Sequence, residues 1–319
     1  MNSPQNKLRV GLHGANGHQI LGQLENHERA EAAALTAFPQ EKIPAWAAEI
    51  QVAPSLDELL ADDSIDLISL CSPRRDSQCA EAIRCLRAGK HVFAEKPCAM
   101  TESDLDRLLE EASVSRRVFH EMGGSAFEQP WLEIGHLARS GAIGTIRQVF
   151  AQKSYPMFPG RNLDPGIDGG LFLQVGIHAA RWIEHGLGLK FLSLKVDSVP
   201  SAANHPIAIS AVFGLEGGAS GTLILNYLNP AKFSSWGNEA LRVWGDAGLI
   251  EAVDGGARTR LVTSEKDCGE IPLTQTPTNW FEAMLDEIIE GKPMPLTLKE
   301  ELHPLRSLLT LSCQTPVSI

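Results

Sequence analysis

The stretch that decides the fold is AGKHVFAEKP, residues 88–97. Val92 to Ala94 predict a short buried strand, and Pro97 stops it because proline lacks an N–H donor. The charged residues Glu95 and Lys96 follow the strand directly. Open α/β sheets bind ligands at the carboxyl ends of their strands. The pair is therefore either a catalytic lysine with its carboxylate partner or an ordinary ion pair, and the local sequence favours the second interpretation.

Apolar runs and amphipathic stretches alternate on both sides of this stretch. Expected strands cover residues 8–12, 32–38, 65–71, 92–95 and 117–120. Expected helices cover residues 18–27, 54–60 and 78–88, and a further helix opens at Thr101, a good N-cap, with Asp104 in the capping-box position. Strands that alternate with helices predict crossover units and a parallel sheet. We therefore expect an α/β fold in which residues 1–122 form a doubly wound domain.

The pattern changes after residue 122. Expected helices cover residues 129–140, 171–184 and 280–290. Expected strands cover residues 145–153, 191–199, 207–215, 219–227, 239–244 and 249–253. Consecutive short strands without helices between them are typical of an antiparallel or mixed sheet. Residues 123–319 are therefore expected to form a second, α+β domain with an open sheet.

Composition limits the class of protein. The chain has 319 residues, of which 43% are hydrophobic and 21% charged, and this length predicts two domains. The net charge of -11 disfavours nucleic acid and anionic membranes as partners. Six cysteines without a C-x-x-C pair argue against a metal site and favour a reducing compartment. No apolar run reaches the roughly 20 residues of a membrane span, so we expect a soluble cytoplasmic protein.

The turn GANG, residues 14–17, lies between an expected strand and an expected helix, which is the context of a dinucleotide site. Glycines there let the backbone approach a pyrophosphate. Asn16 and Gln19 occupy the second and third glycine positions of G-x-G-x-x-G, so the turn fits G-x-x-G better. The alternative is a plain strand–helix turn without a cofactor.

The second expected strand bears on the choice of cofactor. An acidic residue at its end would bind the ribose of NAD, and an arginine nearby would accommodate NADP. Phe38 occupies this position, and Lys42 is the nearest cation. The sequence therefore leaves NAD and NADP open.

The second domain carries DGGLFLQVGIH, residues 168–178, in which Gln174 and His178 lie four residues apart. On a helix they share one face. A histidine there could pass a proton to or from a substrate hydroxyl, and the alternative is a core histidine bonded to a backbone carbonyl. Lys153, Tyr155 and Arg161 flank the preceding loop, where they either contact a polyol or carboxylate substrate or are solvated.

Residues 88–97, the Ser72-Pro73 turn and residues 168–181 together resemble the glucose-fructose oxidoreductase/inositol dehydrogenase/rhizopine-catabolism (Gfo/Idh/MocA) family over almost the whole chain. The resemblance implies a Rossmann domain over residues 1–122 and a substrate-binding and oligomerisation domain over residues 123–319. It also implies NAD or NADP as cofactor and hydride transfer to or from a sugar, polyol or related hydroxy compound. The open sheet of the second domain implies a homodimer or homotetramer.

Carried over by position, the family's motifs imply a role for each matching residue. Lys96 would contact the reacting hydroxyl, His178 would be the acid/base, and Gln174 would take the place of the family's aspartate. The implied cofactor-binding residues are Gly14, Ala15, Asn16, Gly17, His18, Phe38, Ser72, Pro73, Glu95 and Lys96. The implied substrate-binding residues are Lys153, Tyr155 and Arg161.

The sequence departs from the family pattern at Asn16 with Gln19, at Phe38, at Gln174 and at Ser77, where many members carry a histidine. These departures keep two alternatives open. One is an enzyme that oxidises and restores its bound cofactor in each turnover, with net glycoside cleavage or elimination. The other is a non-catalytic or regulatory protein of the same fold.

Overall fold

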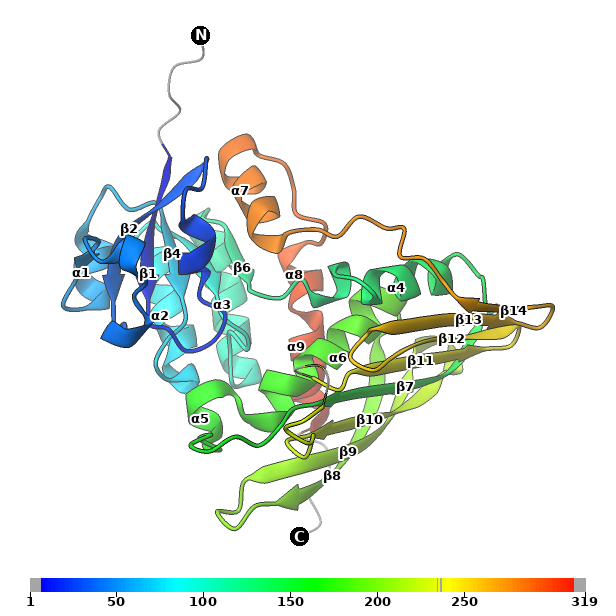
Figure 1. Cartoon of the computed structure of the whole chain (residues 1–319). Helices are drawn as coiled ribbons and strands as arrows, with labels where there is room; N and C mark the ends of the chain where they lie inside the picture. The colour runs from blue at the N-terminus through cyan, green and yellow to red at the C-terminus, as the bar shows by residue number, and fades with distance from the viewer. Residues whose placement is uncertain (1–6, 234, 236, 313–319) are drawn as a thin grey trace. The chain divides into compact units, whose positions relative to one another are not determined.

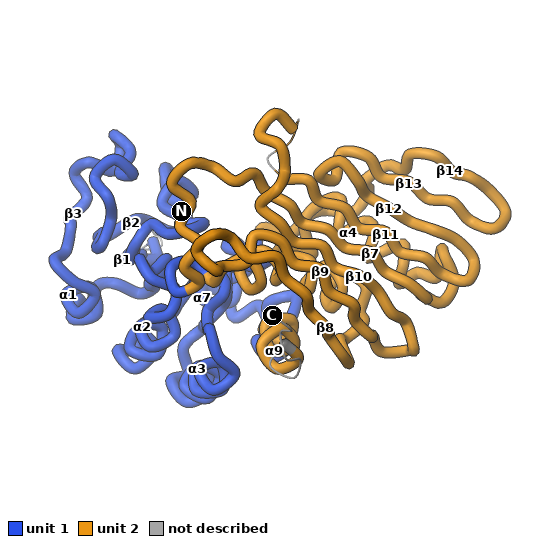
Figure 2. Tube along the Cα trace, turned by 90° about the horizontal axis from the view of Figure 1, so that it is seen from below, with its two compact units in different colours: residues 1–123, 166–168, 280–300 blue, residues 124–165, 169–279, 301–319 orange. Residues whose placement is uncertain are grey.

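The computed structural model describes residues 7–233, 235 and 237–312. Its contacts divide the chain into two compact units, which Figure 2 colours separately. Unit 1 comprises residues 1–123, 166–168 and 280–300, and unit 2 comprises residues 124–165, 169–279 and 301–319. The boundary expected from the sequence at residues 122 and 123 stays a prediction.

Unit 1 is built on a parallel sheet of six strands in the order β3-β2-β1-β4-β5-β6 (Figure 1). The strands are β1 Leu8–His13, β2 Ala30–Thr36, β3 Gln51–Val52, β4 Leu67–Leu70, β5 His91–Ala94 and β6 Phe119–Glu121. Their apolar side chains form the core, since Val10, Leu12 and Ile68 are fully buried. The expected doubly wound parallel sheet is confirmed.

The helices of unit 1 follow local signals in the sequence. They are α1 Leu56–Ala61, α2 Arg75–Arg87, α3 Glu102–Ser115 and α7 Trp280–Glu290, with short 3-10 turns η1 Ile20–Leu24, η2 Gln40–Lys42 and η3 Ala45–Ala47. The cap predicted for α3 is confirmed, because Thr101 Oγ1 accepts the Asp104 N–H at 3.1 Å. The short helices α5 Pro165–Asp168 and α8 Leu298–Glu301 were not expected.

The helix predicted over residues 18–27 is wrong, since only the 3-10 turn η1 forms there. The Gln19 side chain accepts the Ile20 N–H at 2.9 Å and so starts the turn late. Glu25 is extended and Asn26 takes a φ of 56°, and these two residues end the turn early. The apolar residues Ile20, Leu21 and Leu24 are buried in this single 3-10 turn and not along an α-helix.

Helix α7 belongs to unit 1 although it lies far along the chain (Figure 2). Phe281 stacks on Phe93 of β5 with ring centroids 5.7 Å apart, and Met284 and Leu285 are fully buried. Arg29, just before β2, pairs with acidic residues of α7. The apolar face of α7 therefore completes the core of unit 1.

Unit 2 is built on a sheet of eight strands in the order β14-β13-β12-β11-β7-β10-β9-β8 (Figure 1). The strands are β7 Ile146–Ser154, β8 Phe191–Pro200, β9 Pro206–Leu215, β10 Ser220–Asn226, β11 Ala240–Gly245, β12 Gly248–Val253, β13 Arg258–Thr263 and β14 Asp267–Glu270. Strands β7 and β10 pair in parallel and the other neighbours are antiparallel, which confirms the expected mixed sheet. Strands β13 and β14 were not expected.

Helices pack against one face of this sheet. They are α4 Trp131–Arg139, α6 Gly176–Arg181, α9 His303–Ser312 and the π-helical turn η5 Leu171–Val175, which contact its strands. Unit 2 also contains the π-helical turn η6 Trp182–Leu187 and the 3-10 turns η4 Ser125–Phe127 and η7 Glu216–Gly218, the last of which joins β9 to β10. Along β9, Ala211 and Phe213 are buried whereas Val212 between them is 59% exposed. The alternation leaves the second face of the sheet open. None of the helices within the described residues has the length and hydrophobicity that a membrane crossing requires.

Candidate functional site

The glycine turn after β1 depends on two glycines. Gly14 has a φ of +71°, and a Cβ there would lie 2.1 Å from the Cys71 carbonyl oxygen. Gly17 has a φ of +121°, and its Cβ would lie 2.6 Å from the Glu95 carboxyl carbon. Side chains rarely adopt this part of φ space. The G-x-x-G interpretation of the turn therefore has a structural basis.

Glu95 links the end of β5 to this turn. Its carboxylate is buried and accepts the His18 N–H at 2.7 Å, with the His18 Nδ1 at 3.0 Å. Lys96 Nζ lies 3.7 Å from the same carboxylate. Burial raises the pKa of Glu95, but the His18 hydrogen bond and the Lys96 charge outweigh burial and lower the pKa to about 2. Glu95 is thus an ionised anchor for the glycine turn.

The backbone around Lys96 is fixed from two sides. Gln78 on α2 donates its side-chain N–H to the carbonyl oxygens of Glu95 and Pro97. Glu121 at the end of β6 accepts the Cys98 N–H at 2.6 Å. Lys96 itself is 2% exposed. The lysine is therefore held at the carboxyl edge of the sheet, where this class of fold binds ligands.

The departures from the glycine fingerprint have structural roles that sequence reasoning missed. Gln19 donates to the Gly14 carbonyl oxygen at 2.9 Å. The Asn16 side chain donates to the Ile167 carbonyl oxygen at 2.6 Å, and Arg75 Nη2 donates to the Asn16 carbonyl oxygen at 2.7 Å. These bonds hold the turn with side chains where a glycine-rich loop would rely on its backbone alone.

The remaining residues expected to bind the cofactor border the same edge. Lys42 Nζ donates to the Ala15 carbonyl oxygen at 2.8 Å, which brings an exposed ammonium to the glycine turn. Phe38 is half-buried and follows β2. The Ser72 hydroxyl is buried and donates to Glu81, whereas Pro73 is exposed. A glycine turn with a cation beside it fits the phosphates of a dinucleotide.

A buried histidine next to this turn was also missed. His13, the last residue of β1, is 7% exposed, and its Nε2 lies 3.6 Å from Glu81 Oε2. Ser77 donates to the other Glu81 oxygen at 3.1 Å. Burial raises the pKa of Glu81, but His13 and Ser72 outweigh burial and lower the pKa. Nothing in the local pattern of β1 signals this pair, because Glu81 lies far along the chain.

In unit 2 the structure puts Gln174 and His178 on one helical run, η5 followed by α6. Both are half-buried, whereas Val175 and Ile177 beside them are buried, so the two polar side chains share the more accessible face. The Tyr227 hydroxyl donates to Gln174 Oε1 at 3.4 Å. The expected face is present, and Gln174 is oriented by a tyrosine.

The loop residues expected to bind substrate differ in their surroundings. Lys153 is buried and pairs with Glu239 at 2.7 Å. Burial lowers the pKa of Lys153, but Tyr155 and Glu239 outweigh burial and raise the pKa. The Arg161 guanidinium lies 4.1 Å from the centre of the Tyr227 ring. Arg161 and Gln174 therefore meet the same tyrosine.

Asn229 is a further candidate in unit 2 that sequence reasoning missed. It is 7% exposed, and within the described part of the chain neither side-chain polar atom has a hydrogen-bond partner. Its backbone N–H donates to the Tyr155 carbonyl oxygen at 3.1 Å. A buried carboxamide is normally satisfied, so its atoms are available to a ligand or water. An isolated asparagine after a strand gives no signal in the sequence.

No group of three or more His, Cys, Asp or Glu residues that could hold a metal ion occurs in residues 7–233, 235 and 237–312.

Two family models match this chain. One, described as an oxidoreductase family with an NAD-binding Rossmann fold, covers residues 7–121, and the other, the GFO/IDH/MocA C-terminal domain, covers residues 131–251. The chain is 27% identical to the myo-inositol 2-dehydrogenase of Thermotoga maritima, over 38% of this chain and 36% of that enzyme. It spans about two fifths of the length of several curated relatives.

Longer matches agree with these models. The 1,5-anhydro-D-fructose reductase of Ensifer adhaerens is 24% identical over 85% of this chain and 84% of that enzyme. The solved structure of a putative oxidoreductase from Thermotoga maritima superposes with a TM-score of 0.85 at 23% identity, covering 96% of this chain and 97% of the other, which shows the shared fold. Since both of its domain models are matched, the chain belongs to the Gfo/Idh/MocA family of oxidoreductases, with an NAD-binding Rossmann fold in its first part.

Proposed function

We propose that this protein is an NAD(P)-dependent oxidoreductase that transfers a hydride to or from a sugar, a polyol or a related hydroxy compound. The observation that carries the proposal is the buried Glu95–Lys96 pair, fixed at the carboxyl edge of β5 and bonded to the glycine turn. The names of two relatives, for enzymes of myo-inositol and 1,5-anhydro-D-fructose, support this substrate class.

Each candidate residue then has a chemical role. The nicotinamide, when bound, accepts or supplies the hydride. Lys96 hydrogen-bonds the reacting oxygen and stabilises the negative charge that develops there. His178 takes or gives the hydroxyl proton at its imidazole, and Gln174 donates a hydrogen bond without titrating. Arg161 and Asn229 contact substrate hydroxyls.

Two of the residues expected to bind substrate have more specific roles in this proposal. Tyr155 contacts the substrate, and Lys153 supports Tyr155 because its ammonium is 5.2 Å from that ring and is already paired with Glu239. This role for Lys153 follows from its buried ion pair, which leaves its charge balanced before any substrate arrives.

The proposal is tested by incubating the purified protein with NAD or NADP and a panel of polyols and sugars. We expect nicotinamide absorbance to change in step with product. Product formed without a net absorbance change would favour the redox-neutral alternative. Failure of both NADH and NADPH to bind at millimolar concentration would reject the proposal.

We further propose that the Lys42 ammonium binds the 2′-phosphate on the ribose of NADP. The acid that would bind a free ribose is replaced by Phe38, and the Lys42 ammonium lies at the glycine turn. We expect Lys42→Glu to weaken NADPH binding about tenfold or more, as for a lost charge-assisted hydrogen bond, with a smaller effect on NADH. Fluorescence titration with both nucleotides measures this. Equal effects on the two nucleotides would contradict the assignment.

We also propose that the open face of the sheet in unit 2 pairs with a second copy of the chain. Val199 and Val212 are 58% and 59% exposed, and the register of β8 with β9 puts them on the same face. We expect Val212→Asp to shift the chain from a dimer or tetramer to monomer, measured by light scattering. Val114→Asp is the control, because Val114 is 66% exposed on α3. An unchanged mass for Val212→Asp would contradict this interface.

We propose a cytoplasmic location. Cys71, Cys79, Cys85 and Cys98 are buried and form no disulfide within the described part of the chain, and burial raises the pKa of Cys79 and Cys85 to about 12. Thiols kept reduced in this way are typical of a reducing compartment.

A further inference from the structure

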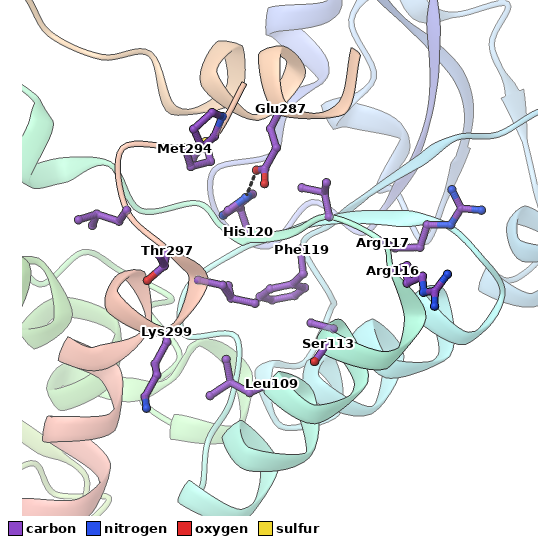
Figure 3. Close-up of a pocket in the computed structure, with 15 residues that line it drawn as sticks. Leu109, Ser113, Arg116, Arg117, Phe119, His120, Glu287, Met294, Thr297 and Lys299 are labelled. Carbon is purple, nitrogen blue, oxygen red and sulfur yellow. Dashed lines mark hydrogen bonds and ion pairs between the residues drawn. The ribbon is translucent and has the colours of Figure 1, made fainter. Parts of the chain in front are cut away.

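A pocket lies within unit 1, beside the edge strand of its sheet. It has a volume of about 760 Å³, and its walls are the carboxyl-terminal half of α3, strand β6 and the segment 293–299 (Figure 3). Strand β6 is the last strand of the sheet, so one side of it has no neighbouring strand. The pocket takes up part of this side.

The floor of the pocket is apolar. Phe119 is 2% exposed and Met294 is 7% exposed, and Leu109 and Leu296 extend the apolar wall. Sites for small molecules are typically hollows of about 300–1,000 Å³ with mostly apolar linings and a few polar groups. The pocket has the size and lining of such a site.

The rim of the pocket is cationic. Arg116 follows α3 and Lys299 lies on α8, and both are exposed and belong to different walls of the pocket (Figure 3). Arg117 adds a third positive charge. The single acid in the lining is Glu287, which is bonded to His120 at 2.7 Å. The rim therefore carries more positive than negative charge, although the chain as a whole has a net charge of -11.

The pocket is separate from the redox site proposed above. Its lining includes Phe119 and His120 of β6, whereas Lys96 follows the carboxyl end of β5. The register pairs Val92 with Phe119 and Ala94 with Glu121, so the pocket begins toward the amino end of the two strands. A dinucleotide at the glycine turn would not need these residues.

We propose that this pocket binds a small organic anion with an apolar body, such as a medium-chain carboxylate. The apolar body lies over Phe119 and Met294, and the cations Arg116, Arg117 and Lys299 around the rim attract the charged group. An inorganic anion would make no use of the apolar lining. A neutral apolar ligand would leave the two cations without a counter-charge.

The test uses isothermal titration of the full chain saturated with NADPH, with decanoate as the probe. We expect decanoate to bind, with decan-1-ol and inorganic phosphate each at least about tenfold weaker. No decanoate binding would overturn the proposal. Decan-1-ol binding as tightly as decanoate would overturn the role of the cations, and phosphate binding as tightly would overturn the role of the floor.

Variants locate the binding. We expect the double variant Arg116→Glu/Lys299→Glu to weaken decanoate binding about a hundredfold and Leu109→Gln about tenfold. Arg107→Glu is the matched control, since Arg107 is an exposed cation on α3 outside the pocket. Decanoate affinity that is unchanged in the double variant, or equally reduced in the control, would overturn the assignment. Circular dichroism verifies that each variant is folded.

Discussion

Substitution of Lys96 by methionine is expected to lower kcat by about a hundredfold to ten-thousandfold. Methionine keeps most of the apolar stem but removes the ammonium that is proposed to stabilise charge on the reacting oxygen. Glu95 retains its His18 hydrogen bonds, so the glycine turn is expected to stay in place. Steady-state kinetics give the rate, and fluorescence titration gives the NADPH affinity. A folded variant that binds NADPH and turns over at the parent rate would contradict the role of Lys96.

A loss of kcat is also expected when His178 is substituted. Singly, His178→Gln is expected to lower kcat by about a hundredfold or more and to remove one limb of the pH profile. In oxidation, where the imidazole accepts the proton, the acidic limb is lost, and in reduction, where it donates the proton, the basic limb is lost. Groups that serve one transition state are strongly non-additive. The double variant Lys96→Met/His178→Gln should therefore lose much less than the product of the two single losses. Losses that multiply fully would mean that the two residues act in independent steps.

Substitution of Gly14 by alanine is expected to destabilise the protein by about 2–6 kcal/mol and to abolish dinucleotide binding. The new Cβ would lie 2.1 Å from the Cys71 carbonyl oxygen, and the φ of +71° adds backbone strain. Because the clash is with backbone, no side-chain rotation relieves it. Urea unfolding followed by circular dichroism measures the stability.

The matched control is Gly22→Ala. No atom lies within 4 Å of a Cβ at Gly22, and its φ is outside the left-handed region. This variant should be neutral or more stable by about 1 kcal/mol at most, because alanine restricts the unfolded chain. If Gly14→Ala and Gly22→Ala are equally stable, the close approach to Cys71 does not constrain the turn.

The sequence predicts elements whose signals are local. The Thr101 cap and the apolar runs of β1, β4 and β5 are examples, since their own residues determine cap and burial. Prediction from the sequence fails where residues far apart in the chain determine the secondary structure. Strand β13, Arg258–Thr263, has charged residues at 258 and 260, and β14 has no aliphatic or aromatic residue. They become strands because β13 pairs with β12 and β14 pairs with β13.

In the candidate functional site, too, the sequence predicts only features that depend on neighbouring residues. The motif around Glu95 and Lys96 is recognisable because its residues are contiguous. The pairing of Lys153 with Glu239, 86 residues away, is set by the neighbouring strands β7 and β11 and cannot be read from either segment. Asn229 cannot be recognised from the sequence either. It becomes a candidate binding residue only because folding buries its side-chain amide without a hydrogen-bond partner among the described residues.

The late position of α7 has a consequence for biosynthesis. Phe93 and its neighbours are made early, but Phe281, which stacks on Phe93, leaves the ribosome nearly two hundred residues later. Until then the nascent first unit carries an uncovered apolar surface, where chaperones would bind. A fragment ending at residue 123 would keep that surface permanently and is a poor choice for separate expression.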